Sequence, residues 1–408
     1  MTRPYEDDLE QLRAIAEADV YKGGAKAATL TRTAAGVEFR YLDGWSGPPV
    51  ATTLPVGSAP VVRSGGALPA YFAGLLPEGR RLGALQRAVK TSADDELSLL
   101  LAVGADAVGD VQVVPAGVAP AEVPPRIAVE DIDRTSFADL LVELGIRAQR
   151  TALPGVQDKT SAAMINLPIT RAGERYILKL NPVGAYPGLV ENEAFFLRAA
   201  RKSGLAAPSS RLVTDRVGAR GLLVRRFDRL TVDGQVQALA VEDGCQAADR
   251  PPADKYLLGA DRTFAALAAV CDAPVVAGRE LIRYLAFAYL TGNGDAHAKN
   301  FSVVRSLDGE WRVAPVYDVP CSYIYGDKTM ALSINGRSGG DFPADAFIAL
   351  GEKLSVPGRA VQRSLSELAA QADRWLPDLD QLPFDRGQVG KLRRVINRRR
   401  GQLDPTNR

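Results

Sequence analysis

The segment that decides the fold is TGNGDAHAKNFSV, residues 291–303. It contains His297, the single histidine among 408 residues, together with Asp295 and Asn300. The preceding stretch, LIRYLAFAYL (281–290), is apolar on nearly every face, which predicts a buried helix. The chain therefore gathers unusual polar chemistry in a loop that directly follows an element of the core.

Asp295, Asn300 and Asp318 are spaced as in enzymes that transfer phosphoryl groups. A hairpin is predicted at 301–316, where FSVV and WRVAPV flank the turn LDG, so Asp318 follows the hairpin. Phosphoryl transfer needs a carboxylate that orients and deprotonates the acceptor hydroxyl, and Asn and Asp oxygens that hold Mg²⁺ on the nucleotide phosphates. Protein kinases place these residues in this order at nearly this spacing. The triplet predicts Asp295 as the catalytic base, and Asn300 and Asp318 as magnesium ligands.

Lys179 lies in the middle of an expected strand, RYILKL (175–180). A buried lysine is costly without a negative partner. Nucleotide phosphates, together with Glu191 or Glu193 on the following helix, would provide one. The alternative is a lysine that points outward from a half-exposed strand.

His297 lies two residues after the predicted base, where kinase catalytic loops often carry a lysine. An imidazole can donate a hydrogen bond there, and Lys299 can supply the positive charge. The alternative is a histidine packed to shape the loop, with a solvated Lys299. Magnesium prefers oxygen ligands, so His297 is not expected to bind the metal.

A short loop, LPGVQDK (153–159), precedes the expected strand. Gly155 permits close approach of the backbone to a ligand. Gln157 and Lys159 can donate to phosphate oxygens. The loop is neither a Walker loop nor a G-x-G-x-x-G sequence, so a plain turn is the alternative.

Three arginines, Arg225, Arg226 and Arg229, flank Phe227 at the end of a second expected strand, 221–229. They could mark a hinge beside an adenine pocket, or they could be solvated surface residues. A basic helix is expected at KLRRVINRRR, which could touch a nucleic acid or an acidic partner, or could simply be a solvated face. It covers residues 391–400.

The composition favours a soluble, cytosolic protein of two or three domains. The net charge is only +2, which argues for neither nucleic-acid nor membrane affinity. No apolar run is long enough to cross a bilayer, and the N-terminus is too acidic for a signal peptide. Three distant cysteines argue against a disulfide framework, and with a single histidine they nearly exclude structural zinc.

Strands dominate the first part of the chain and helices the later part, which predicts a two-lobed α+β architecture. Residues 1–20 are expected to form a helix, because Leu9, Leu12, Ile15 and Ala16 fall on one face. A Pro-rich stretch, VPAGVAPAEVPPR, is expected to be a linker and carries the main boundary. The expected divisions are residues 1–125, 126–229 and 230–408.

Together these residues resemble the HipA toxin kinases of bacterial toxin–antitoxin modules. The matching pieces occur in family order and cover most of the chain. They are LPAYFAGLLPEG (68–79), ALPGVQDKTS (152–161), YILKL (176–180), NEAFFLRAARKSGL (192–205), VRRFDR (224–229), VEDGCQA (241–247), NGDAHAKNFSV (293–303) and YDVPCS (317–322).

The resemblance implies a protein-kinase-like fold with an N-terminal accessory domain and a mainly helical C-terminal lobe. It implies ATP- and Mg²⁺-dependent phosphorylation of a protein serine or threonine, with an aminoacyl-tRNA synthetase as the target and inhibition of translation as the result. A small helix-turn-helix antitoxin resembling HipB would be the partner, and DNA would be contacted mainly through it.

The resemblance also assigns roles by position. Asp295 corresponds to the base, with His297 and Lys299 beside it. The cofactor-binding set consists of Pro154, Gly155, Val156, Gln157, Asp158, Lys159, Lys179, Arg225, Arg226, Phe227, His297, Lys299, Asn300, Tyr317 and Asp318.

Two positions depart from the family pattern. The family often has a serine, which can be autophosphorylated, where this chain has Ala152 beside Thr151. The hinge reads V-R-R-F where V-E-R-F is expected. A degenerate kinase that serves as a binding component of an antitoxin–operator complex is therefore an alternative, as is a small-molecule phosphotransferase.

Overall fold

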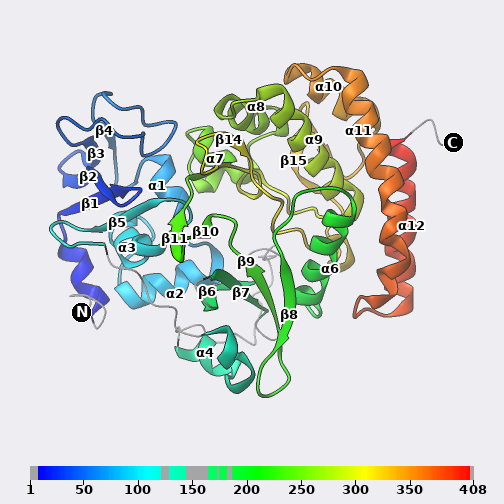
Figure 1. Ribbon diagram of the computed structural model, residues 1–408, viewed down its shortest axis with the longest axis horizontal. Helices are drawn as coiled ribbons and strands as arrows, with labels where there is room; N and C mark the ends of the chain where they lie inside the picture. Colours follow the sequence, from blue (N-terminus) through cyan, green and yellow to red (C-terminus); the bar gives the residue numbers. More distant parts are fainter. Residues whose placement is uncertain (1–7, 121–127, 144–163, 172–173, 182–185, 405–408) are drawn as a thin grey trace.

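The computed structural model describes residues 8–120, 128–143, 164–171, 174–181 and 186–404. These residues form a mixed helix and sheet structure, as the sequence predicted, with strand-rich parts first and a helical part last (Figure 1). The expected boundary at 125/126 and the predicted loop 153–159 lie outside the described residues. No helix in the described part of the chain is long and apolar enough to cross a membrane.

The first part is an antiparallel five-stranded sheet in the order β4-β3-β2-β1-β5. Helices α1 and α3 pack with it, and Phe39, Tyr71 and Phe72 are buried in their shared core, while α2 contacts α3 and η1 (Leu9–Ala14). The strands are β1 (Glu17–Lys22), β2 (Ala25–Thr33), β3 (Gly36–Tyr41), β4 (Val61–Arg63) and β5 (Val111–Pro115), and the helices are α1 (Ala70–Gly74), α2 (Gly79–Val89) and α3 (Glu96–Val103).

The expected helix over residues 1–20 is wrong where the structure describes it. Only Leu9–Ala14 forms a short 3-10 helix, η1, and the chain then enters β1 at Glu17. β1 lies between β2 and β5 and is hydrogen-bonded to both. Pairing with β2, the next strand along the chain, and with the distant β5 outweighs the local helical spacing of apolar residues, since tertiary contacts routinely override weak local preference.

The second part is a four-stranded sheet in the order β6-β7-β9-β8. Helix α6 packs against β8 and β9 of this sheet and brings Phe195 and Phe196 into the core. The elements are η3 (Val129–Arg134), α4 (Phe137–Glu143), β6 (Ile165–Arg171), β7 (Glu174–Leu180), α6 (Leu189–Lys202), β8 (Ser210–Thr214) and β9 (Arg220–Arg225).

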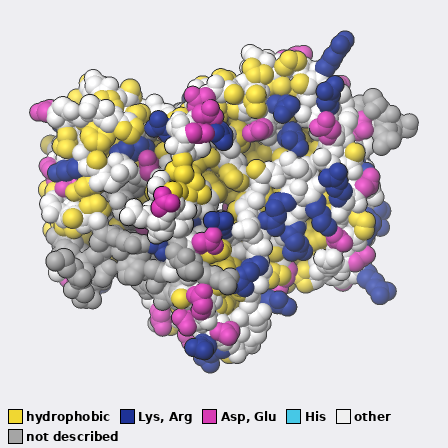
Figure 2. All heavy atoms as spheres, in the orientation of Figure 1, with side chains coloured by type: hydrophobic (Ala, Val, Ile, Leu, Met, Phe, Trp, Pro, Cys, Tyr) yellow, Lys and Arg dark blue, Asp and Glu magenta, His cyan; other side chains and the backbone are white. Residues whose placement is uncertain are grey.

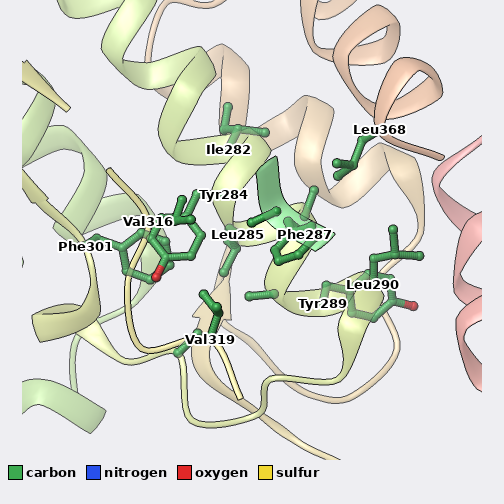
Figure 3. Close-up of a cluster of buried hydrophobic side chains, with 14 of the residues drawn as sticks. Ile282, Tyr284, Leu285, Phe287, Tyr289, Leu290, Phe301, Val316, Val319 and Leu368 are labelled. Atoms are coloured by element: carbon green, nitrogen blue, oxygen red, sulfur yellow. The ribbon is translucent and has the colours of Figure 1, made fainter. Parts of the chain in front are cut away.

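The third part is mainly helical and is built around α9, whose residues Leu281–Thr291 are almost all buried. Figure 3 shows its side chains packed on all sides, as the sequence predicted for 281–290. The predicted hairpin at 301–316 is also confirmed, because β13 and β14 pair antiparallel. The elements are β10 (Arg229–Val232), β11 (Gln235–Ala238), β12 (Val241–Asp243), α7 (Gly244–Ala247), η4 (Pro252–Tyr256), α8 (Ala260–Val270), α9 (Pro274–Thr291), η5 (Ala298–Asn300), β13 (Ser302–Arg305), β14 (Trp311–Val313), η6 (Tyr323–Tyr325), β15 (Met330–Ile334), β16 (Arg337–Gly339), α10 (Ala344–Lys353), α11 (Gly358–Gln371), η7 (Ala372–Arg374), η8 (Leu376–Gln381) and α12 (Arg386–Leu403).

The basic stretch 391–400 lies in α12, on the helical half where lysine and arginine side chains gather in Figure 2. It is not simply a solvated face. Arg399 is 1% exposed and donates to the carbonyl oxygen of Tyr289 near the end of α9. Arg393 pairs with Asp380 of η8, and Arg400 pairs with Asp373 of η7. Part of this charge therefore anchors α12 to the core.

The N-terminal part is joined to the rest through buried charges. Arg226 donates through two nitrogens to Asp228, at 2.9 and 2.8 Å, and also contacts Asp106. Arg229 pairs with the same two carboxylates. Burial by itself opposes a charge at Asp228, but the two guanidinium groups outweigh it and lower the pKa of Asp228 to about 2. A second tie is Glu242, which accepts from the backbone and the hydroxyl of Thr52 at 2.7 Å.

We predict that Asp228→Ala strongly destabilises the protein, because it leaves two buried guanidinium groups without their shared carboxylate. Removing one partner of a buried ion pair typically costs about 3–5 kcal/mol. Chemical denaturation followed by tryptophan fluorescence measures the change. Asp308→Ala removes an exposed carboxylate that pairs with Arg312, and it should leave the midpoint unchanged. Equal midpoints for the two variants would contradict the importance of the buried seam.

Candidate active site

The loop after α9 is held in place by its own polar groups. Gly292 ends the helix with a φ of 77°, a left-handed conformation that glycine adopts without strain. Asn293 then donates through its amide to the carbonyl oxygen of Asp318 at 3.1 Å and accepts from the backbone N–H of Asp295 at 3.2 Å. The Gly294 N–H donates to the Ser322 hydroxyl at 2.8 Å. Hydrogen bonds thus hold the loop that carries Asp295 against the segment that carries Asp318.

Lys179 is the centre of the site. Its ammonium lies 2.6 Å from Oε1 of Glu193 on α6 and 2.8 Å from Oδ1 of Asp318. The lysine is 6% exposed and Glu193 is 1% exposed, so the alternative of an outward-pointing lysine is wrong. Of the two glutamates that the sequence offered, Glu193 and not Glu191 is the partner, because Glu193 lies on the buried face of α6.

Burial and neighbouring charges shift the pKa values of Lys179 and Glu193. Burial alone would lower the pKa of Lys179, but the carboxylates of Asp318 and Glu193 outweigh it and raise the pKa above its ordinary value. Lys179 therefore stays charged at neutral pH. Burial, with the nearby Asp318 charge, raises the pKa of Glu193 to about 7 against the lowering influence of the lysine. Oε2 of Glu193 is buried without a hydrogen bond, so the pairing uses one oxygen.

Asn300 completes the group on the other side of Asp318. Its amide nitrogen donates to Oδ2 of Asp318 at 3.1 Å, and its carbonyl oxygen accepts from the backbone N–H of His297 at 3.0 Å. Asp318 has a φ of 57°, which a non-glycine residue rarely adopts and which is often found at functional sites. A carboxylate and an amide carbonyl oxygen are ligand types that Mg²⁺ accepts, with phosphate oxygens and water completing the shell.

No cluster of three or more His, Cys, Asp or Glu side chains able to hold a metal occurs among the described residues. Mg²⁺ is usually bound by one or two protein side chains together with substrate phosphates and water.

Asp295 lies in the same loop and is 3% exposed. The hydroxyl of Tyr256 donates to its Oδ1 at 2.9 Å. The ring of Tyr256 also meets the His297 ring edge to face, with centroids 5.1 Å apart. Sequence analysis missed Tyr256, and no motif around it marks the contact, because it arrives from the η4 segment outside the loop.

The alternative of a solvated Lys299 is wrong. Its ammonium donates to the carbonyl oxygen of Gly74 at 2.9 Å and lies 3.2 Å from Asp243 and 3.4 Å from Glu78. Burial opposes its charge, but Asp243 and Glu78 raise its pKa. Lys299 thus links the loop to the N-terminal part of the chain.

The residues of the expected hinge, 225–227, have different surroundings. Phe227 stacks on Tyr317 with ring centroids 5.8 Å apart, and the Tyr317 hydroxyl donates to the carbonyl oxygen of Lys299 at 2.7 Å. Arg225 is on the surface and pairs with Glu174. The guanidinium of Arg226 is committed to the buried seam with Asp228, so the solvated alternative is wrong for this residue and for Arg229.

The predicted phosphate-loop residues Pro154, Gly155, Val156, Gln157, Asp158 and Lys159, together with Thr151 and Ala152, lie outside the described residues. An open surface depression of about 630 Å³ is lined by Arg13 of η1 and residues of and after α2. It shares no residue with the cluster around Lys179.

Comparison with known proteins gives consistent matches along the chain. A model of the HipA-like C-terminal domain matches residues 151–376, and one of the HipA N-terminal domain matches residues 18–114. The protein Y4mE of Sinorhizobium fredii is 29% identical over 383 residues, covering 86% of this chain and 90% of that protein. The serine/threonine-protein kinase toxin HipA of Shewanella oneidensis is 26% identical over 378 residues, covering 84% and 85%.

A solved structure agrees in fold. The Shewanella oneidensis HipA chain in a complex with HipB and operator DNA aligns with a TM-score of 0.76 and 22% identity, covering 94% of this chain and 96% of that chain. This likeness confirms the α+β fold class that the sequence predicted.

We predict that Lys179→Met lowers the free energy of unfolding by about 3–5 kcal/mol, because two carboxylates then face each other without their cation. The cost should fall when Glu193→Gln is added, with a coupling of roughly 0.5–3 kcal/mol between the two positions. Denaturant titration of both single variants and the double variant measures this coupling. Lys202→Met, which removes a lysine from a partly exposed pair with Asp378, is the matched control. Additive effects at 179 and 193 would contradict the contact.

Proposed function

The chain belongs to the HipA family, and from that premise we propose that it is an ATP- and Mg²⁺-dependent serine/threonine protein kinase. The proposal rests on the ion pairs of Lys179 with Glu193 and Asp318. Asn300 donates a hydrogen bond to the same Asp318. This is the set that phosphoryl transfer uses to bind nucleotide phosphates and metal. Asp295, in the same loop as Asn300, supplies a carboxylate for the acceptor.

Each residue has a role that its surroundings permit. Lys179 moves from Asp318 to the nucleotide phosphates while Glu193 holds its other side. Asn300 and Asp318 are the residues that would hold Mg²⁺, which when bound neutralises charge on the phosphates. Pro154 to Lys159 would cradle the phosphates, as the family resemblance implies. The backbone of Arg225 to Phe227, with Tyr317 behind Phe227, would border the adenine.

The acceptor hydroxyl oxygen forms a bond to the γ-phosphorus of ATP, and the bond from that phosphorus to the β,γ-bridging oxygen breaks. ADP leaves, and the proton of the hydroxyl passes to Asp295. Because Asp295 is nearly buried, the acceptor side chain has to enter the site, which suits a serine or threonine on an accessible segment of a partner protein.

The biological role follows the family. Its S. oneidensis relative is named a kinase toxin, and the solved structure of that HipA includes HipB and operator DNA. We propose by this likeness that the chain acts as the toxin of a cytoplasmic toxin–antitoxin module. Its partner would be a helix-turn-helix antitoxin, its substrate an aminoacyl-tRNA synthetase, and its effect the inhibition of translation. DNA would be reached through the antitoxin.

The three-part division into residues 1–125, 126–229 and 230–408 is part of this proposal. The first would be the accessory domain, the second would carry the phosphate loop and Lys179, and the third would carry the catalytic loop.

We predict that Asp295→Asn lowers phosphoryl transfer roughly 10²- to 10⁴-fold, the usual contribution of a positioned base. The assay incubates the full chain with γ-labelled ATP, Mg²⁺ and a cell lysate, and follows the label into a protein band. Binding of Mg²⁺–ATP, measured by calorimetry, should persist in the variant because Lys179, Asn300 and Asp318 are unchanged.

The matched control is Asp308→Asn in the exposed turn between β13 and β14, which should transfer phosphate at the unaltered rate. Brief expression in cells should reduce incorporation of labelled amino acids for the unaltered chain and for Asp308→Asn, but not for Asp295→Asn. Transfer by Asp295→Asn at the full rate would show that the base is assigned wrongly.

A further inference from the structure

Tyr256 reaches Asp295 from outside the catalytic loop. It ends the short η4 segment, Pro252–Tyr256, between α7 and α8. Its hydroxyl donates to Oδ1 of Asp295 at 2.9 Å, and its ring packs edge to face on His297. Burial, with the charge of Asp295, raises the pKa of Tyr256, so the phenol stays protonated and remains a donor at neutral pH.

The N-terminal part of the chain holds this tyrosine in place through Glu78. The carboxylate of Glu78, which precedes α2, pairs with Lys255, and the Lys255 ammonium lies 5.1 Å from the centroid of the Tyr256 ring. The other oxygen of Glu78 is 3.4 Å from the ammonium of Lys299, which lies in the loop that carries Asp295. The carboxylate of Glu78 therefore contacts both the segment that carries Tyr256 and the loop that carries Asp295.

We propose that Tyr256 is a positioning residue for Asp295, and that Glu78 keeps Tyr256 in that position from the N-terminal part of the chain. This inference rests on the proposed kinase function. It assigns the N-terminal part a role in assembling the acceptor side of the site, in addition to any role in binding partners.

A fixed donor suits the chemistry of a general base. A carboxylate can rotate about its terminal C–C bond, and rotation moves its oxygens away from the geometry in which one of them accepts the proton of the incoming hydroxyl. The Tyr256 hydroxyl, as a donor fixed on Oδ1, holds the plane of the Asp295 carboxylate in one orientation. Groups held in the productive geometry before the reaction lower the barrier, and small misplacements can cost about a hundredfold in rate. Lysines at 255 and 299 placed on one glutamate limit movement of both segments.

A merely structural role for Tyr256 makes different predictions from a positioning role. A hydroxyl that only stabilises η4 would affect transfer equally whether or not Asp295 is present. A hydroxyl that acts through Asp295 loses its effect once that carboxylate is gone. The double-mutant cycle between the two positions separates these cases, because residues that act as a unit are strongly non-additive.

The experiment measures the initial rate of transfer from labelled ATP, with Mg²⁺, into the lysate protein that the unaltered full-length chain labels. We expect Tyr256→Phe, which keeps the ring, to lower the rate at saturating ATP roughly 10- to 100-fold, with the KM for ATP unchanged. In the Asp295→Asn background the same substitution should change the rate less than about twofold. Tyr41→Phe, which removes a tyrosine hydroxyl bonded to Leu54 and Val50 in the N-terminal sheet, should leave the rate unchanged.

Glu78→Gln tests the tether from outside the loop. It should lower the rate in the unaltered background and add little to Tyr256→Phe. This variant also keeps the inference testable if Tyr256→Phe fails to fold, since calorimetric binding of Mg²⁺–ATP reports whether each variant is intact.

Three outcomes would overturn the inference: an unchanged rate for Tyr256→Phe, an equal loss in both Asp295 backgrounds, or independent losses for positions 78 and 256. Failure is distinguishable from failure of the proposed function. If the unaltered chain binds no Mg²⁺–ATP and labels no protein, the kinase assignment itself is wrong and this inference falls with it.

Discussion

The structure depends on one buried contact, in which the ammonium of Lys179 lies between the carboxylates of Glu193 and Asp318. The three residues come from β7, from α6 and from the segment after the hairpin, so the contact joins elements far apart in the chain. Burying charges is expensive, and a buried pair is weak evidence of stability alone. We propose that the chain keeps three ionisable groups together here, beside a strained Asp318 backbone, because the arrangement binds phosphate and metal and not because it stabilises the core.

The N-terminal part is integrated with this centre and is not a loosely attached module. Buried arginines at 226 and 229 share Asp228 and Asp106 across the junction, and Glu242 binds Thr52. Glu78 extends the same contact surface, through Lys299, to the loop that carries Asp295. The geometry of the loop is therefore set from two sides, by α9 behind it and by the N-terminal part beside it.

The structure follows from the sequence where the signal lies within one stretch, and it does not where strand pairing or contacts between elements decide it. The buried helix α9, the hairpin after it and the polar loop between them could be predicted from 281–316 alone, because hydrophobic spacing and turn residues lie within that stretch. The choice of Glu193 over Glu191 needed the buried face of α6. β1 was mistaken for helix because its stabilisation comes from pairing with β2 and β5.

The candidate site divides in the same way. The order of Asp295, Asn300 and Asp318 was readable from spacing, and the structure brings Asn300 and Asp318 into direct contact. Tyr256 and Glu78 could not be found, since nothing in their local sequence indicates a partner in the loop. The burial of Arg226 was equally hidden, because Asp106 approaches from a distant part of the chain.

The proposed function depends on Lys179, Asn300 and Asp318 forming a nucleotide and metal site. A crystal structure of the full chain with Mg²⁺ and a non-hydrolysable ATP analogue tests it most directly. We expect a metal at about 2.0–2.1 Å from oxygens of Asn300 and Asp318, with the Lys179 ammonium bound to a phosphate and still paired with Glu193. Nucleotide bound elsewhere, with the Lys179–Asp318 contact unchanged, would contradict it.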